Sequence, residues 1–290
     1  MRIILSSNPY RDRGLRAALE ARKILERAGA STVLCLPFTP KKGDRVELPN
    51  RCTLSRLEEE LPRADLLICF GGDGTILPAA RDATLHNIPI LGVNMGSVGF
   101  MAELERGELS LLSQLARGKF KTEERMMLDV RVLRGGRVIS EDLALNDAVI
   151  SKGSMARVAE VEVLADQVPI TALVGDGVIV STPTGSTAYS MSAGGPIVEP
   201  TSQCLIVTPV CAHQLTARAM VLASERQVTV RLPKASRKYL FLSVDGGKAV
   251  RLAGGDRVEI RRSEHRTRLV QLADRSFYRV VNQKLGGPLP

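Results

Sequence analysis

The sequence contains no tryptophan, and aromatic residues make up only 3% of its 290 positions. A hydrophobic content of 44% still predicts a packed core, which must be built from aliphatic side chains. No apolar run approaches the roughly 20 residues of a membrane span, and the start, MRIILSSN, is too short in its apolar part for a signal peptide. We therefore expect a soluble protein without a membrane partner.

Cysteine motifs that bind metal are also missing. The five cysteines include no C-x-x-C pair, and Cys35 and Cys69 lie inside apolar runs, where a free thiol behaves as a small buried side chain. An odd number of cysteines without ligand spacing argues against zinc and favours a reducing compartment. We expect a cytoplasmic protein.

Basic residues outnumber acidic ones by 40 to 31, which gives a formal net charge of +9. A basic surface attracts anions, and these include nucleic acids, nucleotides and pyrophosphates. The densest basic run, residues 257–268, has no aromatic residue interleaved, whereas a base-stacking platform requires them. We interpret the run as a solvated basic face and expect no nucleic-acid partner.

Strand and helix patterns alternate through the first 120 residues. Buried strands are predicted in RIILSS, STVLCL, DLLICF and IPILGVN, and helices over 11–29, 53–61 and 75–86. Strands separated by helices predict an α/β domain with a doubly wound, Rossmann-like parallel sheet, in which ligands bind beyond the carboxyl ends of the strands. Both GGDGT (71–75) and NMGSVGF (94–100) follow such ends.

From residue 121 the pattern changes to short alternating strands that are rich in Val, Ile and Thr and separated by glycine turns. This pattern predicts an all-β, sandwich-like C-terminal domain over residues 121–269. The closing segment SFYRVVNQKLG has a helical pattern. We expect residues 270–290 to return to the domain formed by residues 1–120.

An acid, Asp73, lies at the centre of the first glycine loop. A strand that leads into Gly-Gly-x-Gly and then a helix brings backbone N–H groups close to a ligand, and a phosphate suits such a place. The loop lacks the Gly-Lys-Ser/Thr ending of a P-loop, however, and a carboxylate repels a bare phosphate. Asp73 therefore either meets a hydroxyl or a metal-bound phosphate, or caps the helix over 75–86. These residues alone leave both interpretations open.

Two later segments carry further polar side chains. The pair Asn146–Asp147 lies at a strand end, where it either holds a ribose or a base edge or forms an Asx turn. The segment GDGVIVSTPTGSTAYSMSAGG (175–195) places Asp176 between two glycines and continues into a turn rich in Ser and Thr. The hydroxyls of that turn need hydrogen-bond partners, which a nucleotide or the loop itself could supply.

In their order, these segments resemble the motifs of the NAD kinase family. The matching segments are GGDGT (71–75), NMGSVGF (94–100), LNDAVI (145–150), the block 175–195 and TPVCAHQLTARAMVL (208–222). The resemblance extends over nearly the whole chain, and block 175–195 is its most specific part. It implies phosphorylation of the 2′-hydroxyl of the adenosine ribose of NAD to give NADP. The implied donor is ATP with a divalent metal such as Mg²⁺, and some members also use inorganic polyphosphate.

The resemblance also implies roles for single residues. Asp73 is the proton acceptor for the ribose hydroxyl, with Gly74 beside it, and Asn146 and Asp147 contact the dinucleotide. Asp176 contacts it from another side, often across a subunit boundary, which implies a homodimer or homotetramer. The other implied ligand contacts are Phe100, Arg157, Thr187, Ala188, Tyr189, Ser190, Met191 and Ser192. Because the metal is expected to arrive with the triphosphate, we expect no protein metal ligand.

Four positions depart from the family pattern. Asp147 stands where Glu is usual, Leu173–Val174 where an aromatic residue and Arg are frequent, and Gly247 where Gln is frequent. Two alternatives also fit parts of the sequence: a lipid or sugar kinase with a GGDGT-like motif, and a non-catalytic module that senses NAD or NADP. The hydroxyl-rich block 175–195 argues against the first, and a costly buried acid at a ribose argues against the second.

Overall fold

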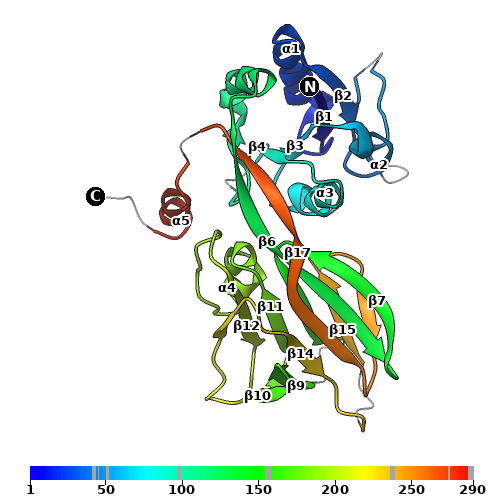
Figure 1. Cartoon of the computed structure of the whole chain (residues 1–290), viewed down its shortest axis with the longest axis vertical. Helices are drawn as coiled ribbons and strands as arrows, with labels where there is room; N and C mark the ends of the chain where they lie inside the picture. The colour runs from blue at the N-terminus through cyan, green and yellow to red at the C-terminus, as the bar shows by residue number, and fades with distance from the viewer. Residues whose placement is uncertain are drawn as a thin grey trace. The chain divides into compact units, whose positions relative to one another are not determined.

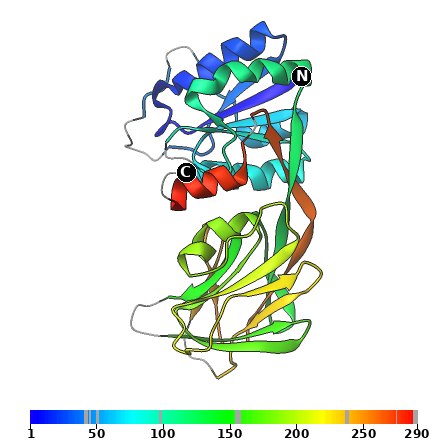
Figure 2. The same ribbon diagram turned by 90° about the vertical axis from the view of Figure 1, so that its left-hand side faces the viewer.

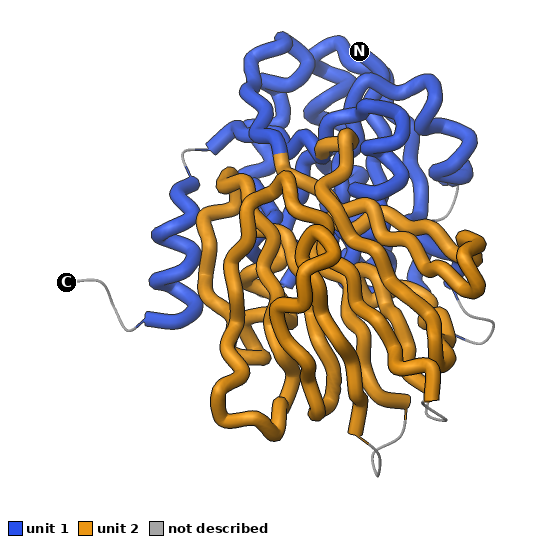
Figure 3. The backbone as a smooth tube through the Cα atoms, turned by 60° about the horizontal axis from the view of Figure 1, so that its bottom comes forward, with its two compact units in different colours: residues 1–124, 267–290 blue, residues 125–266 orange. Residues whose placement is uncertain are grey.

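The computed structural model describes residues 1–40, 44, 46–49, 52–96, 99–153, 158–235, 239–273 and 275–286. The chain divides into two compact units, coloured separately in Figure 3. Unit 1 comprises residues 1–124 and 267–290, and unit 2 comprises residues 125–266. Within the ranges described, no helix is both long and apolar enough to cross a membrane.

A parallel sheet forms the centre of unit 1 (Figure 1). Its main strands are β1 (Arg2–Ser7), β2 (Ser31–Cys35), β3 (Leu66–Gly71) and β4 (Ile90–Asn94), in the spatial order β2-β1-β3-β4. The short β5 (Leu104–Glu105) pairs with β4, as does the end of β17 (Arg257–Gln271). Because the chain moves from β1 to β2 on one side and then to β3 on the other, the carboxyl ends of β1 and β3 form a topological switch point, where ligands bind in such sheets.

Helices cover this sheet, and Figure 2 shows α1 and η3 side by side on it. Small residues on α1 (Ala17, Ala18 and Ala21) are fully buried, so the helix can pack closely on the strands. The helical elements of unit 1 are η1 (Arg13–Leu15), α1 (Arg16–Arg27), α2 (Leu57–Glu60), η2 (Leu61–Arg63), α3 (Asp73–Leu85), η3 (Arg106–Arg117) and α5 (Phe277–Leu285).

Helix α1 begins at Arg16, five residues after the predicted start at residue 11. The backbone of Gly14 and Leu15 has positive φ values of 66° and 50°, which an α-helix cannot include. The helix predicted over 53–61 is likewise shortened to the single turns α2 and η2.

The C-terminal segment belongs to unit 1. The carboxylate of Glu103 accepts hydrogen bonds from the backbone N–H groups of Leu272 and Ala273, both at 2.6 Å. The hydroxyls of Thr84 and Thr267 are hydrogen-bonded at 2.8 Å inside the unit. These contacts fix the chain as it leaves β17 and enters α5.

Unit 2 is a sandwich of two sheets, which confirms the predicted fold class. One sheet is antiparallel, in the order β13-β12-β11-β8-β15-β16, and the other contains β6, β7, β9, β10, β14 and β17. Buried valines such as Val178 and Val180 of one sheet and Val161 and Val163 of the other belong to one core cluster. The strands are β6 (Lys121–Arg134), β7 (Arg137–Ala144), β8 (Asp147–Lys152), β9 (Ala159–Ala165), β10 (Val168–Gly175), β11 (Gly177–Ser181), β12 (Cys204–Val210), β13 (Met220–Ala223), β14 (Val228–Arg231), β15 (Leu240–Val244) and β16 (Val250–Leu252). Two short helices, η4 (Thr184–Thr187) and α4 (Tyr189–Ser192), follow β11.

Candidate active site

The glycine loop connects β3 to α3 at the switch point of the sheet. Gly71 must be a glycine, because a Cβ there would lie 2.6 Å from the Cβ of Thr75. The side chain of Asn8, which follows β1, donates to the hydroxyl of Thr75 at 3.0 Å, and its backbone N–H donates to the carbonyl of Phe70 at 2.9 Å. These bonds tie the ends of β1 and β3 together beside the loop.

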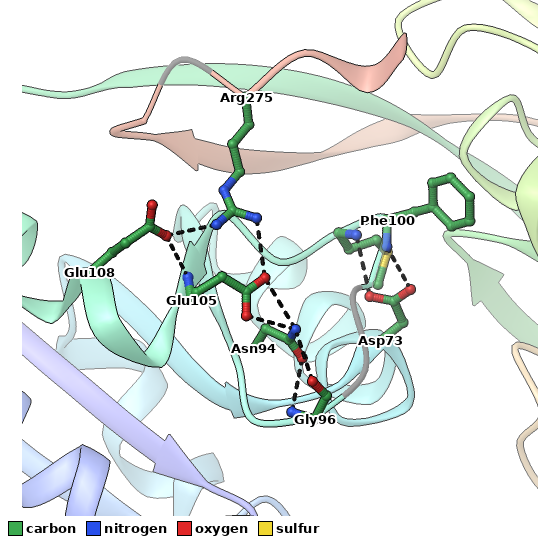
Figure 4. A network of polar contacts seen from close by, with 8 residues as sticks. Asp73, Asn94, Gly96, Phe100, Glu105, Glu108 and Arg275 are labelled. Carbon is green, nitrogen blue, oxygen red and sulfur yellow. Dashed lines mark hydrogen bonds and ion pairs between the residues drawn. The ribbon is translucent and has the colours of Figure 1, made fainter. Parts of the chain in front are cut away.

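Asp73 is the first residue of α3, and Gly72 is the N-cap. The Asp73 side chain makes no capping hydrogen bond to its own helix, so the interpretation of Asp73 as the cap is wrong. Its carboxylate instead accepts hydrogen bonds from the backbone N–H of Phe100 to Oδ2 (3.0 Å) and of Met101 to Oδ1 (3.2 Å), as Figure 4 shows. The two glycine motifs predicted from sequence are therefore directly joined.

Gly99 allows this contact by having no side chain. A Cβ added at Gly99 would overlap Oδ1 of Asp73 and would lie 3.0 Å from its Cγ. Any larger residue at position 99 must push the carboxylate away from its two N–H donors or displace the loop.

A second set of polar contacts holds the start of the same loop (Figure 4). Asn94 donates from Nδ2 to Glu105 at 2.9 Å and accepts from the backbone N–H of Gly96 at 3.1 Å. Arg275 pairs with Glu105 at 3.2 Å and with Glu108 at 2.7 Å. A hydrogen bond from the backbone N–H of Glu105, strengthened by Arg275, holds the pKa of Glu108 below its ordinary value.

The ring of Phe100 lies against the C-terminal helix. The Nζ of Lys284 is 4.3 Å from the centre of the Phe100 ring, and the Phe277 ring is 6.4 Å away, centre to centre. The segment after β17 thus supports the residue whose N–H group holds Asp73. Gly74, the next residue of α3, is exposed.

In unit 2, the Asn146–Asp147 pair lies where β8 begins, and Asp245 holds it there. The Asp245 carboxylate accepts the backbone N–H groups of Leu145 (2.7 Å), Asn146 (2.8 Å) and Asp147 (3.0 Å). Asp245 itself has a φ of 48°, in the left-handed region, which aspartate adopts more readily than most residues other than glycine. Three consecutive N–H groups on one carboxylate define the path of this turn.

The acids of this turn resist ionisation. Burial, and then the charge of Asp245, raises the pKa of Asp147 to about 7. Burial also raises the pKa of Asp245, although its three N–H bonds oppose the shift. Asp147 can therefore donate a hydrogen bond as a neutral acid near neutral pH, as well as accept one.

The turn after β11 packs on Asn146, because β11 ends beside the start of β8. The Thr182 hydroxyl donates to the carbonyl of Leu145 at 2.6 Å, and the backbone N–H of Thr182 donates to the carbonyl of Asn146 at 2.9 Å. A Cβ at Gly185 would overlap the Asn146 carbonyl oxygen. The Oδ1 of Asn146 and the hydroxyl of Thr184 are buried and have no hydrogen-bond partner among the described residues. Both atoms lie near the start of β8, where a ligand would supply the hydrogen-bond partners that they lack.

The segment 187–192 divides into inward and outward side chains. Ser190 is fully buried, and its hydroxyl is hydrogen-bonded to that of Thr208 at 2.8 Å. The hydroxyl of Thr187 donates to the carbonyl of Thr184 at 3.2 Å. Tyr189 is 46% exposed. Of the remaining predicted contacts in this segment, Ala188 and Met191 are half-buried and Ser192 is exposed.

Asp176 directly precedes β11, whereas the turn that packs on Asn146 follows the other end of this strand. Ser181 is opposite Asp147 in the ladder, whereas Gly177 is opposite Ser151, so about five residues of strand, roughly 16 Å, separate Asp176 from Asp147. Asp176 forms an ion pair with Lys152 at 2.5 Å. Within one chain the structure does not bring Asp176 together with Asn146, and Arg157 lies outside the described residues.

The site offers no obvious metal centre or thiol nucleophile. Among the described residues, no group of three or more His, Cys, Asp or Glu side chains could hold a metal ion. Burial raises the pKa of Cys35 and Cys69 to about 12, so their thiolates are not formed at neutral pH.

Sequence reasoning did not single out Asn8, Gly99 or Asp245 as site residues. Asn8 could have been found, because it directly follows the strand that borders the switch point. Gly99 was inside a recognised motif, yet its contact with Asp73 spans residues distant in sequence. Asp245 is about 100 residues away from the turn that it holds, and no local pattern indicates such a contact.

Two family models and many known proteins match most of the chain. Residues 18–120 match the ATP-NAD kinase N-terminal domain, and residues 145–272 match the ATP-NAD kinase C-terminal domain. The chain is 34% identical to the NAD kinase of Ruminiclostridium cellulolyticum over 285 residues, which cover 96% of each chain. It is 45% identical to the NAD kinase of Geobacter sulfurreducens over 78% of this chain and 80% of that one.

Two solved structures share the fold. An NAD kinase from Archaeoglobus fulgidus in complex with ATP superposes with a TM-score of 0.75 at 26% identity, covering 98% of both chains. Yeast NADH kinase complexed with NADH superposes with a TM-score of 0.84, covering all of this chain and 89% of the other. At 23% identity, the second likeness is one of fold alone.

Proposed function

Because this chain belongs to the NAD kinase family and phosphorylates NAD, we propose that Asp73 accepts the proton of the adenosine-ribose 2′-hydroxyl during the transfer. The bond between that oxygen and the γ-phosphorus of ATP forms, the bond to the ADP leaving group breaks, and the proton moves to the Asp73 carboxylate. Family membership sets aside the lipid- or sugar-kinase and sensing-module alternatives.

The pair of N–H bonds from Phe100 and Met101 carries this proposal. They fix the direction of the Asp73 carboxylate, and each oxygen retains a further lone pair for the substrate hydroxyl. Phosphoryl transfer depends mainly on positioning and on neutralising charge, so an acceptor held by the backbone suits this reaction. A ribose hydroxyl is weakly acidic, and a carboxylate within hydrogen-bond reach is the partner that it needs.

In this proposal the all-β unit binds the dinucleotide. The Oδ1 of Asn146 and the hydroxyl of Thr184, which lack a partner among the described residues, support a contact with ribose or adenine groups, with Asp147 beside them. The exposed ring of Tyr189 offers a flat apolar surface for a base. The remaining ligand contacts that we propose in this segment are Thr187, Ala188, Met191 and Ser192. The buried Ser190 holds the segment in place through its hydrogen bond to Thr208.

Magnesium is taken up as part of the ATP substrate. In this proposal the triphosphate oxygens hold the ion. The ion neutralises charge on the phosphates. The solved relative in complex with ATP supports ATP as the donor.

A homodimer or homotetramer is the form that we propose for the active enzyme. Asp147 begins β8, and Asp176 precedes the far end of its partner β11, so a second copy of the chain would bring its Asp176 to the part of a dinucleotide that is bound at Asn146. The free cysteines support a cytoplasmic location.

The proposal is tested by measuring NADP formation with ATP and with polyphosphate as donors, and with NAD and NADH as acceptors. We expect ATP with NAD to give product. Calorimetry with NAD on the Asp73→Asn variant should show retained binding, because Asp73 acts on the proton rather than holding the ligand. Loss of NAD binding in that variant would make Asp73 a binding residue and overturn the assignment.

A further inference from the structure

A pocket of about 450 Å³ lies in unit 2 and shares no lining residue with the candidate active site. It is formed where the β6–β7 turn meets the end of β14 and the start of β17. Besides two leucines, its lining consists of Gly135, Gly136, Arg231, Lys234, Gly255 and Arg257. The volume lies in the range of pockets that hold small molecules, about 300–1,000 Å³.

The lining contains three cationic side chains and no acidic one. Arg231 and Arg257 are directly opposite each other in the antiparallel pair of β14 and β17. Like charges in that position destabilise a sheet. Glu162 is 3.7 Å from Arg231, but both side chains are more than one-third exposed, so this pair offsets little of the repulsion.

The acid next to Arg257 in the sequence, Asp256, already has hydrogen-bond partners outside the pocket lining. Asp256 is buried, and its carboxylate accepts hydrogen bonds from Arg134 at 2.9 and 2.7 Å and from the N–H of Ala253 at 2.8 Å. Among the described residues, neither Lys234 nor Arg257 has an ion-pair partner. Within the described residues, the compensation of these three cations is thus limited to Arg231, which pairs with Glu162 and donates to Oε1 of Gln167 at 2.8 Å.

Glycines keep the pocket open. Gly135, Gly136 and Gly255 have φ values of 57°, 81° and 88°, which favour glycine over any residue with a side chain. A Cβ at Gly255 would lie 3.5 Å from Cγ of Lys234 and would fill space beside that side chain.

We propose that this pocket binds a small anion carrying two or more phosphate groups, separately from the substrates at the candidate active site. One phosphate neutralises at most two of the three positive charges, so an oligophosphate fits better than orthophosphate. Binding relieves the repulsion between Arg231 and Arg257, and it therefore stabilises unit 2.

Hydrogen–deuterium exchange of the full-length protein tests the proposal, with inorganic tripolyphosphate as the probe and orthophosphate as the comparison. We expect tripolyphosphate to protect peptides that contain residues 131–137 and 253–258. The Arg257→Gln and Lys234→Gln variants should each need about tenfold more tripolyphosphate for the same protection, which is the usual effect of losing one charged hydrogen bond. Lys23→Gln removes an exposed cation from α1 and should change nothing.

Thermal unfolding supplies a second measurement. Without tripolyphosphate, Arg257→Gln should unfold at the same or a higher temperature than wild type, because it removes a repulsive pair. If Arg257→Gln folds poorly, the exposed Lys234 allows the same comparison at little risk to folding. Equal tripolyphosphate dependence in wild type and Lys234→Gln, or protection confined to peptides outside the pocket, would overturn the proposal. Neither result depends on NADP formation, so the proposed function is judged separately.

Discussion

Replacement of Gly99 by alanine tests how strictly the Asp73 carboxylate must be placed. The added Cβ would overlap Oδ1 of Asp73 and lie 3.0 Å from its Cγ. Because α3 fixes the Asp73 backbone, the carboxylate must rotate or the loop must withdraw. Either movement lengthens at least one of the N–H bonds from Phe100 and Met101, now 3.0 and 3.2 Å.

The expected size of the effect follows from that bond. A hydrogen bond to a charged group contributes about 1.5–3 kcal/mol. If the whole contribution is lost in the transition state, kcat/KM for NAD falls roughly 10- to 150-fold. Steady-state NADP formation with saturating ATP and magnesium measures this loss, and thermal unfolding shows whether the variant is folded.

Gly107→Ala is the matched control. Gly107 is exposed, and a Cβ there meets nothing within 4 Å, so the same chemical change should leave both rate and stability unaltered. A Gly99→Ala enzyme with a rate within twofold of wild type would refute the reasoning. It would show that the carboxylate tolerates displacement and that its placement by the loop is unimportant.

Three further predictions concern unit 2. Asp245→Ala leaves the N–H groups of the turn at Asn146 without their acceptor, and we expect a loss of about 2–4 kcal/mol in unfolding free energy, measured with urea, and a raised KM for NAD. The pKa of Asp147 is raised from 3.8 to about 7, so the folded protein holds a proton that the unfolded chain releases. Its stability contribution is complete below about pH 4 and is lost as the pH rises to about 7, and Asp147→Asn should flatten urea midpoints across that window. Thr184→Val removes a buried hydroxyl that has no partner in the described part of the chain, so it should stabilise the free protein by about 1 kcal/mol while calorimetry shows weaker NAD binding. An equal loss of stability and affinity would contradict a ligand-facing hydroxyl.

The fold followed from the sequence because its signals are local. Alternating strands and helices indicate a parallel sheet, and Val-rich strands with period two indicate a sandwich, before any contact is known. The exact start of α3 did not follow. An acid near a helix start can be the N-cap or the first helical residue, and only the bonds to Phe100 and Met101 show which one Asp73 is.

The site was predictable as a set of motifs but not as a geometry. The sequence presents the hydroxyls of 184–192 as equivalent, yet Ser190 is bonded inside the unit and Thr184 has no partner among the described residues. Which hydroxyl faces a ligand depends on Thr208, which lies on another strand. The hold of Asp245 on the Asn146 turn is similarly non-local.

The turnover number of Asp73→Asn at saturating NAD and ATP tests the central claim most directly. The amide preserves the size of the side chain but cannot take up the ribose proton. Because general base catalysis contributes about 10²- to 10⁴-fold, we predict a fall in kcat of at least about 100-fold in a folded variant that still binds NAD. A kcat equal to that of wild type would contradict the assignment of Asp73 as the proton acceptor.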